Sequence, residues 1–185
     1  MLRTRASIQY HSQFKRTELL RNKEAKVMKA VVAYDSVYGN TKLVAEAVAE
    51  QIRSEGHEVE LISVKDEGGR VTAGDFMFVG SPTRMGRMTK NTKRFLEGLD
   101  VEPWKNKPIV AFDTVGPLPT DEEKRKKWLS RIDKGAAYGI QELVKARGLN
   151  AHPDVLHIAV TSFKGPLASD GLSIAKDFAH RFMSR

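Results

Sequence analysis

Residues 29–35 (KAVVAYD), 36–41 (SVYGNT) and 41–54 (TKLVAEAVAEQIRS) follow one another directly and decide the fold. The first stretch is apolar and rich in β-branched residues, which predicts a buried strand. The last stretch places apolar residues three and four positions apart, which predicts an amphipathic helix. Between them lies a short polar stretch that contains a glycine. Together they predict a strand–loop–helix unit in a sheet that is covered by helices.

The same alternation continues to the end of the chain. Further strands are predicted at residues 57–64, 75–80, 107–114 and 155–163. Further helices are predicted at residues 90–99, 121–147 and 170–183, the middle one in two parts that meet near Gly135. Five strands separated by helices predict an α/β fold with a doubly wound parallel sheet, because a closed barrel needs about 200 residues or more. The strand order 2-1-3-4-5 and the Rossmann order both fit, and in either one ligands bind at the carboxyl ends of the strands.

Length and charge divide the chain into two unequal parts. The sequence has 185 residues, of which 41% are hydrophobic, and this is enough for one domain with a full core. Residues 1–27 contain seven basic and two acidic residues, and they contribute +5 of the formal net charge of +8. We expect residues 1–27 to be a disordered basic extension and residues 28–185 to be the domain.

Composition excludes several kinds of chemistry. The sequence contains no cysteine, which excludes disulfides and thiolate sites and fits a reducing compartment such as the cytoplasm. None of the five histidines has the spacing of a metal-binding pair, so we expect no metal site. No acid–base dyad is evident, and we expect no catalytic residue. We also expect no nucleic-acid partner, because few aromatic side chains accompany the basic residues, and no membrane span.

The loop at residues 36–41 has the features of a phosphate-binding cradle. Gly39 lets the backbone turn so that its N–H groups can approach an anion. The start of the predicted helix adds free N–H groups and the positive end of the helix dipole. Ser36, Asn40 and Thr41 supply side-chain donors. The alternative is an ordinary helix cap, in which the side chain of Asn40 or Thr41 accepts a backbone hydrogen bond.

Two loops of this sequence resemble those of a known family. The order strand, S-x-Y-G-N-T, helix resembles the T/S-x-T-G-N-T signature of flavodoxins, whose loop binds the phosphate of FMN. Residues 80–86 (GSPTRMG) resemble the flavodoxin loop beside the flavin ring, where a peptide flips on reduction, and we place that peptide at Met85 and Gly86. The resemblance covers residues 28–185. It implies a flavodoxin-like three-layer fold with strand order 2-1-3-4-5, and FMN as the cofactor.

The resemblance also implies which residues bind the cofactor. They belong to the loops that follow the first, third and fourth predicted strands. The predicted cofactor-binding residues are Ser36, Val37, Tyr38, Gly39, Asn40, Thr41, Ser81, Pro82, Thr83, Arg84, Met85, Gly86, Asp113, Thr114, Val115 and Gly116. Asp35 and Asp113 stand at strand ends close to this site, and we expect both to accept hydrogen bonds from backbone donors.

The chain departs from the flavodoxin pattern around the flavin ring. The loop at residues 112–117 has no aromatic residue after Phe112, and Arg84 stands where an aromatic side chain often stacks on the ring. Such stacking is worth roughly 0.5–1.5 kcal/mol per aromatic pair, so we expect an open ring and weaker FMN binding. Tyr38 replaces a threonine that is common in the family, which removes one hydroxyl donor beside the phosphate.

Basic residues surround the second loop. They are Arg84, Arg87, Lys90, Lys93 and Arg94. One interpretation is a positive rim that raises the redox potential of the flavin and recruits an acidic partner protein or an anionic reductant such as NAD(P)H. The alternative is a solvated helix face without a specific role.

The sequence is compatible with three functions. The favoured one is an FMN-binding electron-transfer protein that shuttles electrons between redox partner proteins, because the domain is short and lacks catalytic groups. The second is an NAD(P)H-dependent, FMN-containing flavin or quinone reductase whose open ring admits a small substrate. The third is a protein that binds a phosphate ligand without redox chemistry.

Overall fold

The computed structural model describes residues 26–66, 71, 73–117, 119–132 and 135–184. Apart from Lys26 and Val27, the predicted N-terminal extension lies outside the described residues. The domain boundary at Met28 remains a prediction, and the chain enters its first strand at Lys29.

Five parallel strands form one sheet in the order β2-β1-β3-β4-β5, which confirms the predicted order. The strands are β1 (Lys29–Tyr34), β2 (Glu58–Ser63), β3 (Phe76–Pro82), β4 (Ile109–Val115) and β5 (Leu156–Ala159). β1 pairs with β2 on one side and with β3 on the other, so the order reverses at β1. The carboxyl ends of β1 and β3 therefore form the crevice at which doubly wound sheets bind ligands.

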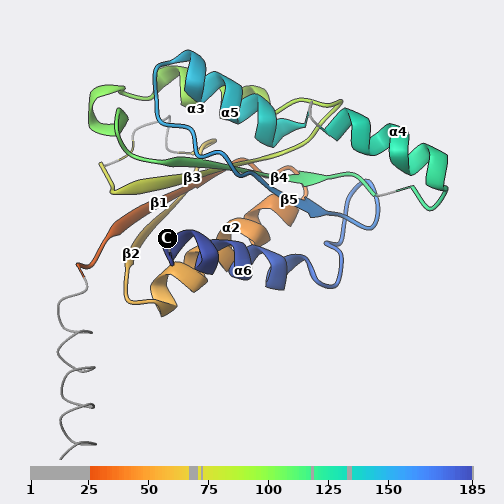
Figure 1. Cartoon of the computed structure of the whole chain (residues 1–185), viewed down its shortest axis with the longest axis horizontal. Helices are drawn as coiled ribbons and strands as arrows, with labels where there is room; N and C mark the ends of the chain where they lie inside the picture. The colour runs from red at the N-terminus through yellow and green to blue at the C-terminus, as the bar shows by residue number, and fades with distance from the viewer. Residues whose placement is uncertain (1–25, 67–70, 72, 118, 133–134, 185) are drawn as a thin grey trace, which may run out of the picture.

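Helices cover both faces of the sheet (Figure 1). α2 (Asn40–Ser54) and α6 (Gly171–Met183) pack side by side on one face, while α3 (Lys90–Gly98) and α5 (Ala136–Ala146) pack on the other. A short 3₁₀ helix, η1 (Glu102–Trp104), precedes β4, and α4 (Glu122–Ile132) precedes α5. The break between α4 and α5 falls where the sequence predicts it.

Alternate side chains of each central strand fill the two cores. Phe76 and Phe78 of β3 pack with buried residues of α2 and α6, whereas Met77 and Val79 pack with buried residues of α3 and α5. This two-residue period is what a strand buried on both faces requires. The central strands therefore have little freedom to shift in register.

β5 is shorter than predicted. The sequence predicts a strand at residues 155–163, but the strand ends at Ala159. Beyond it the chain folds back on itself: Val160 forms an antiparallel bridge with Leu167, and the Thr161 N–H donates to the Pro166 carbonyl. The apolar residues at 160 and 163 thus belong to a loop at the carboxyl edge of the sheet, where Val160 is buried and Phe163 is exposed.

Gly80 leaves room in β3 for the side chain of Phe112, its partner residue in β4. A Cβ atom at this position would lie 2.0 Å from Cζ of Phe112, whose side chain is fully buried. We expect Gly80→Ala to lower the free energy of unfolding by about 1–3 kcal/mol, the usual cost of overpacking a core. Urea denaturation with an unchanged m-value measures the loss.

Gly98 provides the matched control, since a Cβ atom there meets nothing within 4 Å. Gly98→Ala should leave stability unchanged or raise it by up to about 1 kcal/mol, because alanine favours the helix. Equal effects of the two substitutions would contradict the close approach.

Candidate functional site

A cavity of about 220 Å³ opens at the carboxyl edge of the sheet. Its lining comes from the loops after β1, β3, β4 and β5. The lining residues are Ser36, Val37, Tyr38, Asn40, Thr41, Pro82, Thr83, Arg84, Met85, Thr114, Val115, Gly116, Val160 and Phe163. The cavity lies where strand order reverses, as the ligand site of this kind of sheet should.

The first loop enters α2 through a glycine. Gly39 is the N-cap, with φ of 90° in the left-handed region, and no side chain caps the helix. The alternative prediction of a cap by Asn40 or Thr41 is therefore wrong. Asn40 Nδ2 instead donates to the Lys164 carbonyl at 3.0 Å, and the hydroxyl of Thr41 lies 2.9 Å from that of Thr114.

Polar groups are left without partners at this end of α2. The N–H groups of Asn40, Thr41 and Lys42 have no acceptor within the part of the chain that the structure describes. The hydroxyl oxygen of Ser36 is buried and has no partner there either. A buried hydroxyl without a hydrogen bond is costly, so this arrangement indicates that a ligand atom completes it. Convergent donors at the positive end of a helix suit an anion such as phosphate.

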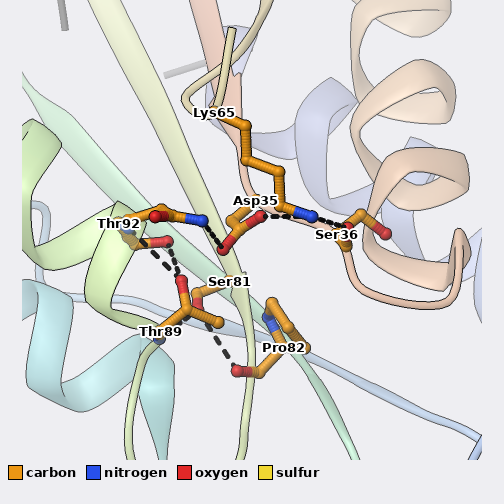
Figure 2. Close-up of polar contacts among 8 residues, drawn as sticks. Asp35, Ser36, Lys65, Ser81, Pro82, Thr89 and Thr92 are labelled. Atoms are coloured by element: carbon orange, nitrogen blue, oxygen red, sulfur yellow. Dashed lines mark hydrogen bonds and ion pairs between the residues drawn. The ribbon is translucent and has the colours of Figure 1, made fainter. Parts of the chain in front are cut away.

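Lys65, which follows β2, contacts the first loop at Asp35 and Ser36 (Figure 2). Lys65 Nζ donates to the Ser36 carbonyl at 2.9 Å and lies 3.5 Å from the Asp35 carboxylate. The other oxygen of Asp35 accepts from Asn91 Nδ2 at 3.3 Å. Asp35 is only 1% exposed. The expectation that Asp35 accepts from backbone donors is therefore wrong: both of its partners are side chains.

Ser81 links β3 to the start of α3. Its hydroxyl group accepts from the Thr89 N–H at 3.0 Å, and its O–H donates to the Pro82 carbonyl at 3.2 Å (Figure 2). Thr89 in turn caps α3, because its hydroxyl oxygen accepts from the Thr92 N–H at 3.3 Å. Ser81 thus fixes both ends of the second loop.

The second loop is a two-residue hairpin. Arg84 and Arg87 exchange both backbone hydrogen bonds, at 2.9 and 3.0 Å. The residues between them, Met85 and Gly86, have φ of 51° and 75°. A methionine rarely adopts this left-handed conformation, and such strained positions concentrate at functional sites. The Met85 side chain is fully exposed at the tip of the hairpin.

Asp113 connects Thr83 of the second loop to α5. It is completely buried, and one oxygen accepts from the Thr83 hydroxyl at 2.7 Å and from the Ala137 N–H at 3.0 Å. The other oxygen lies 2.7 Å from Nδ1 of His157. Asp113 therefore accepts from a backbone donor as expected, but it faces α5 and positions Thr83 rather than lining the cavity.

Most predicted cofactor-binding residues gather at the cavity. Twelve of the sixteen line it; the other four, Gly39, Ser81, Gly86 and Asp113, shape the loops around it. Their contact with a cofactor remains a prediction.

Two lining residues, Val160 and Phe163, are not among the predicted cofactor-binding residues, because the apolar run at residues 155–163 predicts a strand that includes them. Phe163 is exposed and lies 6.2 Å from the Tyr38 ring, with the Arg84 guanidinium 5.6 Å from each ring. The cavity thus has aromatic side chains from the first and last loops. A large apolar residue beside a Lys-Gly-Pro turn is the signal that could have identified Phe163.

The sheet order, the covering helices and the cavity at the reversal point define a flavodoxin-like α/β protein. A family model described as flavodoxin domain matches residues 31–183, and the chain belongs to this family. The fold is shared with a solved structure of a flavodoxin from the domain Archaea, which is 26% identical, with a TM-score of 0.63 over 85% of this chain and 97% of that one. Oxidised flavodoxin 1 from Bacillus cereus has a TM-score of 0.60 at 19% identity, over 85% and 98% of the two chains.

Two curated relatives match parts of the sequence. A flavodoxin from Aquifex aeolicus (strain VF5) is 46% identical over 94 residues, which is 48% of this chain and 50% of that protein. The flavodoxin-like domain-containing protein BilS from Clostridioides difficile (strain CD3) is 33% identical over 89 residues, 48% of each. The match thus spans about half the length of these two relatives. Among the described residues, no helix is long and apolar enough to cross a membrane.

Asp35 should matter for stability because it is a buried charge with specific partners. We expect Asp35→Ala to lower the free energy of unfolding by about 1–3 kcal/mol, since it leaves Asn91 and the Ser36 loop without their anchor. The exposed pair Lys42–Glu46, 3.7 Å apart, supplies the control. Glu46→Ala should cost no more than about 0.5 kcal/mol. Urea denaturation of both variants measures the difference, and equal losses would contradict the anchoring role.

Proposed function

We propose that this chain binds FMN through residues 28–185 and carries electrons between redox partner proteins. The observation that carries the proposal is the buried Ser36 hydroxyl without a partner, beside the unpartnered N–H groups at the start of α2. Flavodoxins generally bind FMN, and this donor set fits its phosphate. Bound FMN would supply a carrier that accepts one or two electrons.

The phosphate end of the site is built from the first loop. Ser36 and the N–H groups of Asn40 to Lys42 would hold the phosphate, while Asn40 and Thr41 keep the loop in shape through their side chains. Lys65 turns the Ser36 carbonyl toward itself. A carbonyl held in this way cannot face an anion, so the lysine favours the binding conformation of the loop.

The ring end of the site is built from the other loops. Tyr38 and Phe163 offer aromatic surface, Arg84 offers a planar cation, and residues 114–116 contribute to the lining of the cavity. Aromatic and guanidinium groups both stack on flat ligands. These side chains would hold the flavin ring in place of the two aromatic walls that the sequence lacks.

The lining of the cavity supports a carrier rather than an enzyme. Among its described lining residues, only Tyr38 and Arg84 have ionisable side chains. The buried carboxylate of Asp113 is committed to Thr83, α5 and His157. A carrier needs only a bound flavin and an exposed edge through which electrons can pass to a partner, and the hairpin at Met85 provides such an edge.

Ser36→Ala tests the phosphate assignment. We expect FMN affinity to fall about tenfold or more, because a hydrogen bond to a charged group contributes about 1.5–3 kcal/mol. Affinity for riboflavin, which lacks the phosphate, should stay within about twofold. Quenching of flavin fluorescence measures both affinities.

Ser54→Ala is the control, since the Ser54 hydroxyl donates to the Gln51 carbonyl at the far end of α2. Its affinities should match those of the unaltered protein. An unaltered protein that binds no FMN would refute the proposal, and an equal loss of riboflavin affinity in Ser36→Ala would refute the phosphate assignment.

Anaerobic reduction of the FMN-loaded protein tests the carrier role. We expect NADPH alone to leave the flavin absorbance unchanged, and NADPH with a flavoprotein reductase as the protein donor to bleach it. Free FMN with the same reagents controls for reduction in solution. Rapid bleaching by NADPH alone would identify a reductase instead of a carrier.

A further inference from the structure

A second hollow adjoins the cofactor cavity on the α5 side. It has a volume of about 910 Å³ and lies between the second loop, the start of α3 and the first half of α5. We call it the basic groove, and its lining residues are Arg84, Met85, Gly86, Arg87, Met88, Thr89, Lys90, Lys93, Gly135, Gly139 and Glu142. Arg84 and Met85 line both the groove and the cofactor cavity, so a partner seated in the groove would touch the cavity wall.

The groove concentrates positive charge that the fold itself does not neutralise. Four of its lining residues are cationic, and Glu142 is the one acid among the described lining residues. Arg87 and Lys90 have no carboxylate within 4 Å in the described part of the chain. Lys93 pairs with Glu97 at 3.6 Å, an exposed contact of little strength. Like charges gathered in this way repel one another and attract an anionic surface.

Met85 adds an apolar contact between the groove and the cofactor cavity, since it lines both. Its side chain is fully exposed, and its left-handed backbone places it at the tip of the hairpin. An exposed methionine ringed by cations matches the anatomy of a protein interface, in which an apolar centre is surrounded by charged residues. A nucleotide needs the cations but gains little from an apolar tip that projects into solvent.

We propose that the basic groove is the docking surface for a redox partner protein whose contact face carries aspartate and glutamate side chains. The proposal rests on the proposed electron-carrier function. It specifies the partner by the negative charge of its contact face. Complementary charge would speed the encounter and fix the orientation. Met85 would then lie at the centre of the contact, beside the wall of the cofactor cavity.

Poly-L-glutamate serves as the probe of the groove, because it presents carboxylates on a polypeptide. We expect it to bind the full chain at low salt, to lose affinity as salt rises, and to shift the backbone NMR signals of residues 84–93. The double variant Arg87→Glu, Lys90→Glu should lower this affinity by about tenfold or more. Neither residue lines the cofactor cavity, so FMN affinity should remain unchanged.

Lys105→Glu with Lys145→Glu is the matched control. Lys105 precedes β4 and Lys145 lies in the last turn of α5, so both are at the opposite edge of the sheet, and the change in net charge is the same. The control should keep its affinity for poly-L-glutamate within about threefold.

Three results would overturn the docking surface. They are equal losses of affinity in the two double variants, NMR shifts confined to other surfaces, and binding of 2′,5′-ADP that displaces poly-L-glutamate and shifts the same signals. The last would assign the groove to a nucleotide. Poly-L-glutamate needs no bound flavin to reach the groove, so failure of FMN binding and failure of docking are separate outcomes.

Discussion

The start of helix α2 has no capping side chain, and the arrangement of the candidate site follows from this. Gly39 turns the chain into the helix, while the side chains of Asn40 and Thr41 are engaged with Lys164 and Thr114. The N–H groups of residues 40–42 and the Ser36 hydroxyl have no partner among the described residues, and Ser36, Asn40 and Thr41 line the cavity. A helix end in this state needs water or an anion. The surrounding loops are arranged so that an anion can reach it.

Two buried carboxylates hold those loops in place. Asp35 connects the first loop to Lys65 beyond β2 and to Asn91 in α3, and Asp113 connects Thr83 of the second loop to α5 and to His157 of β5. A buried carboxylate is costly unless its partners stay in position. A movement of the joined loops that separates either carboxylate from its partners would therefore cost free energy. Within the described residues, the hairpin tip at Met85 and Gly86 is held by the backbone bonds between Arg84 and Arg87 alone, which leaves this peptide as the adaptable part of the site.

The sequence predicts the fold well because the deciding signals are local. Apolar periods of two and of 3.6 residues identify the strands and helices, and the glycine-containing loop identifies the ligand edge. Contacts between residues that are far apart in the sequence cannot be predicted from these local patterns. The partner of Asn40 lies 124 residues away, and Lys65 has no sequence feature that separates it from other lysines after edge strands. The apolar residues that continue past Ala159 predict a strand as far as Phe163, whereas backbone bonds within residues 160–168 end the strand earlier.

Arg84 lines both the candidate cofactor cavity and the basic groove, so in the proposed function it would couple partner docking to the redox potential of the flavin. Its guanidinium lies over Tyr38 and Phe163, so its positive charge is held at the wall between the two hollows. A positive charge there stabilises the added negative charge of a reduced flavin and raises its potential. Carboxylates of a docked partner would offset that charge and lower the potential again. In the proposed docking mode the carrier therefore retains its electrons while free and releases them more readily when the partner is bound.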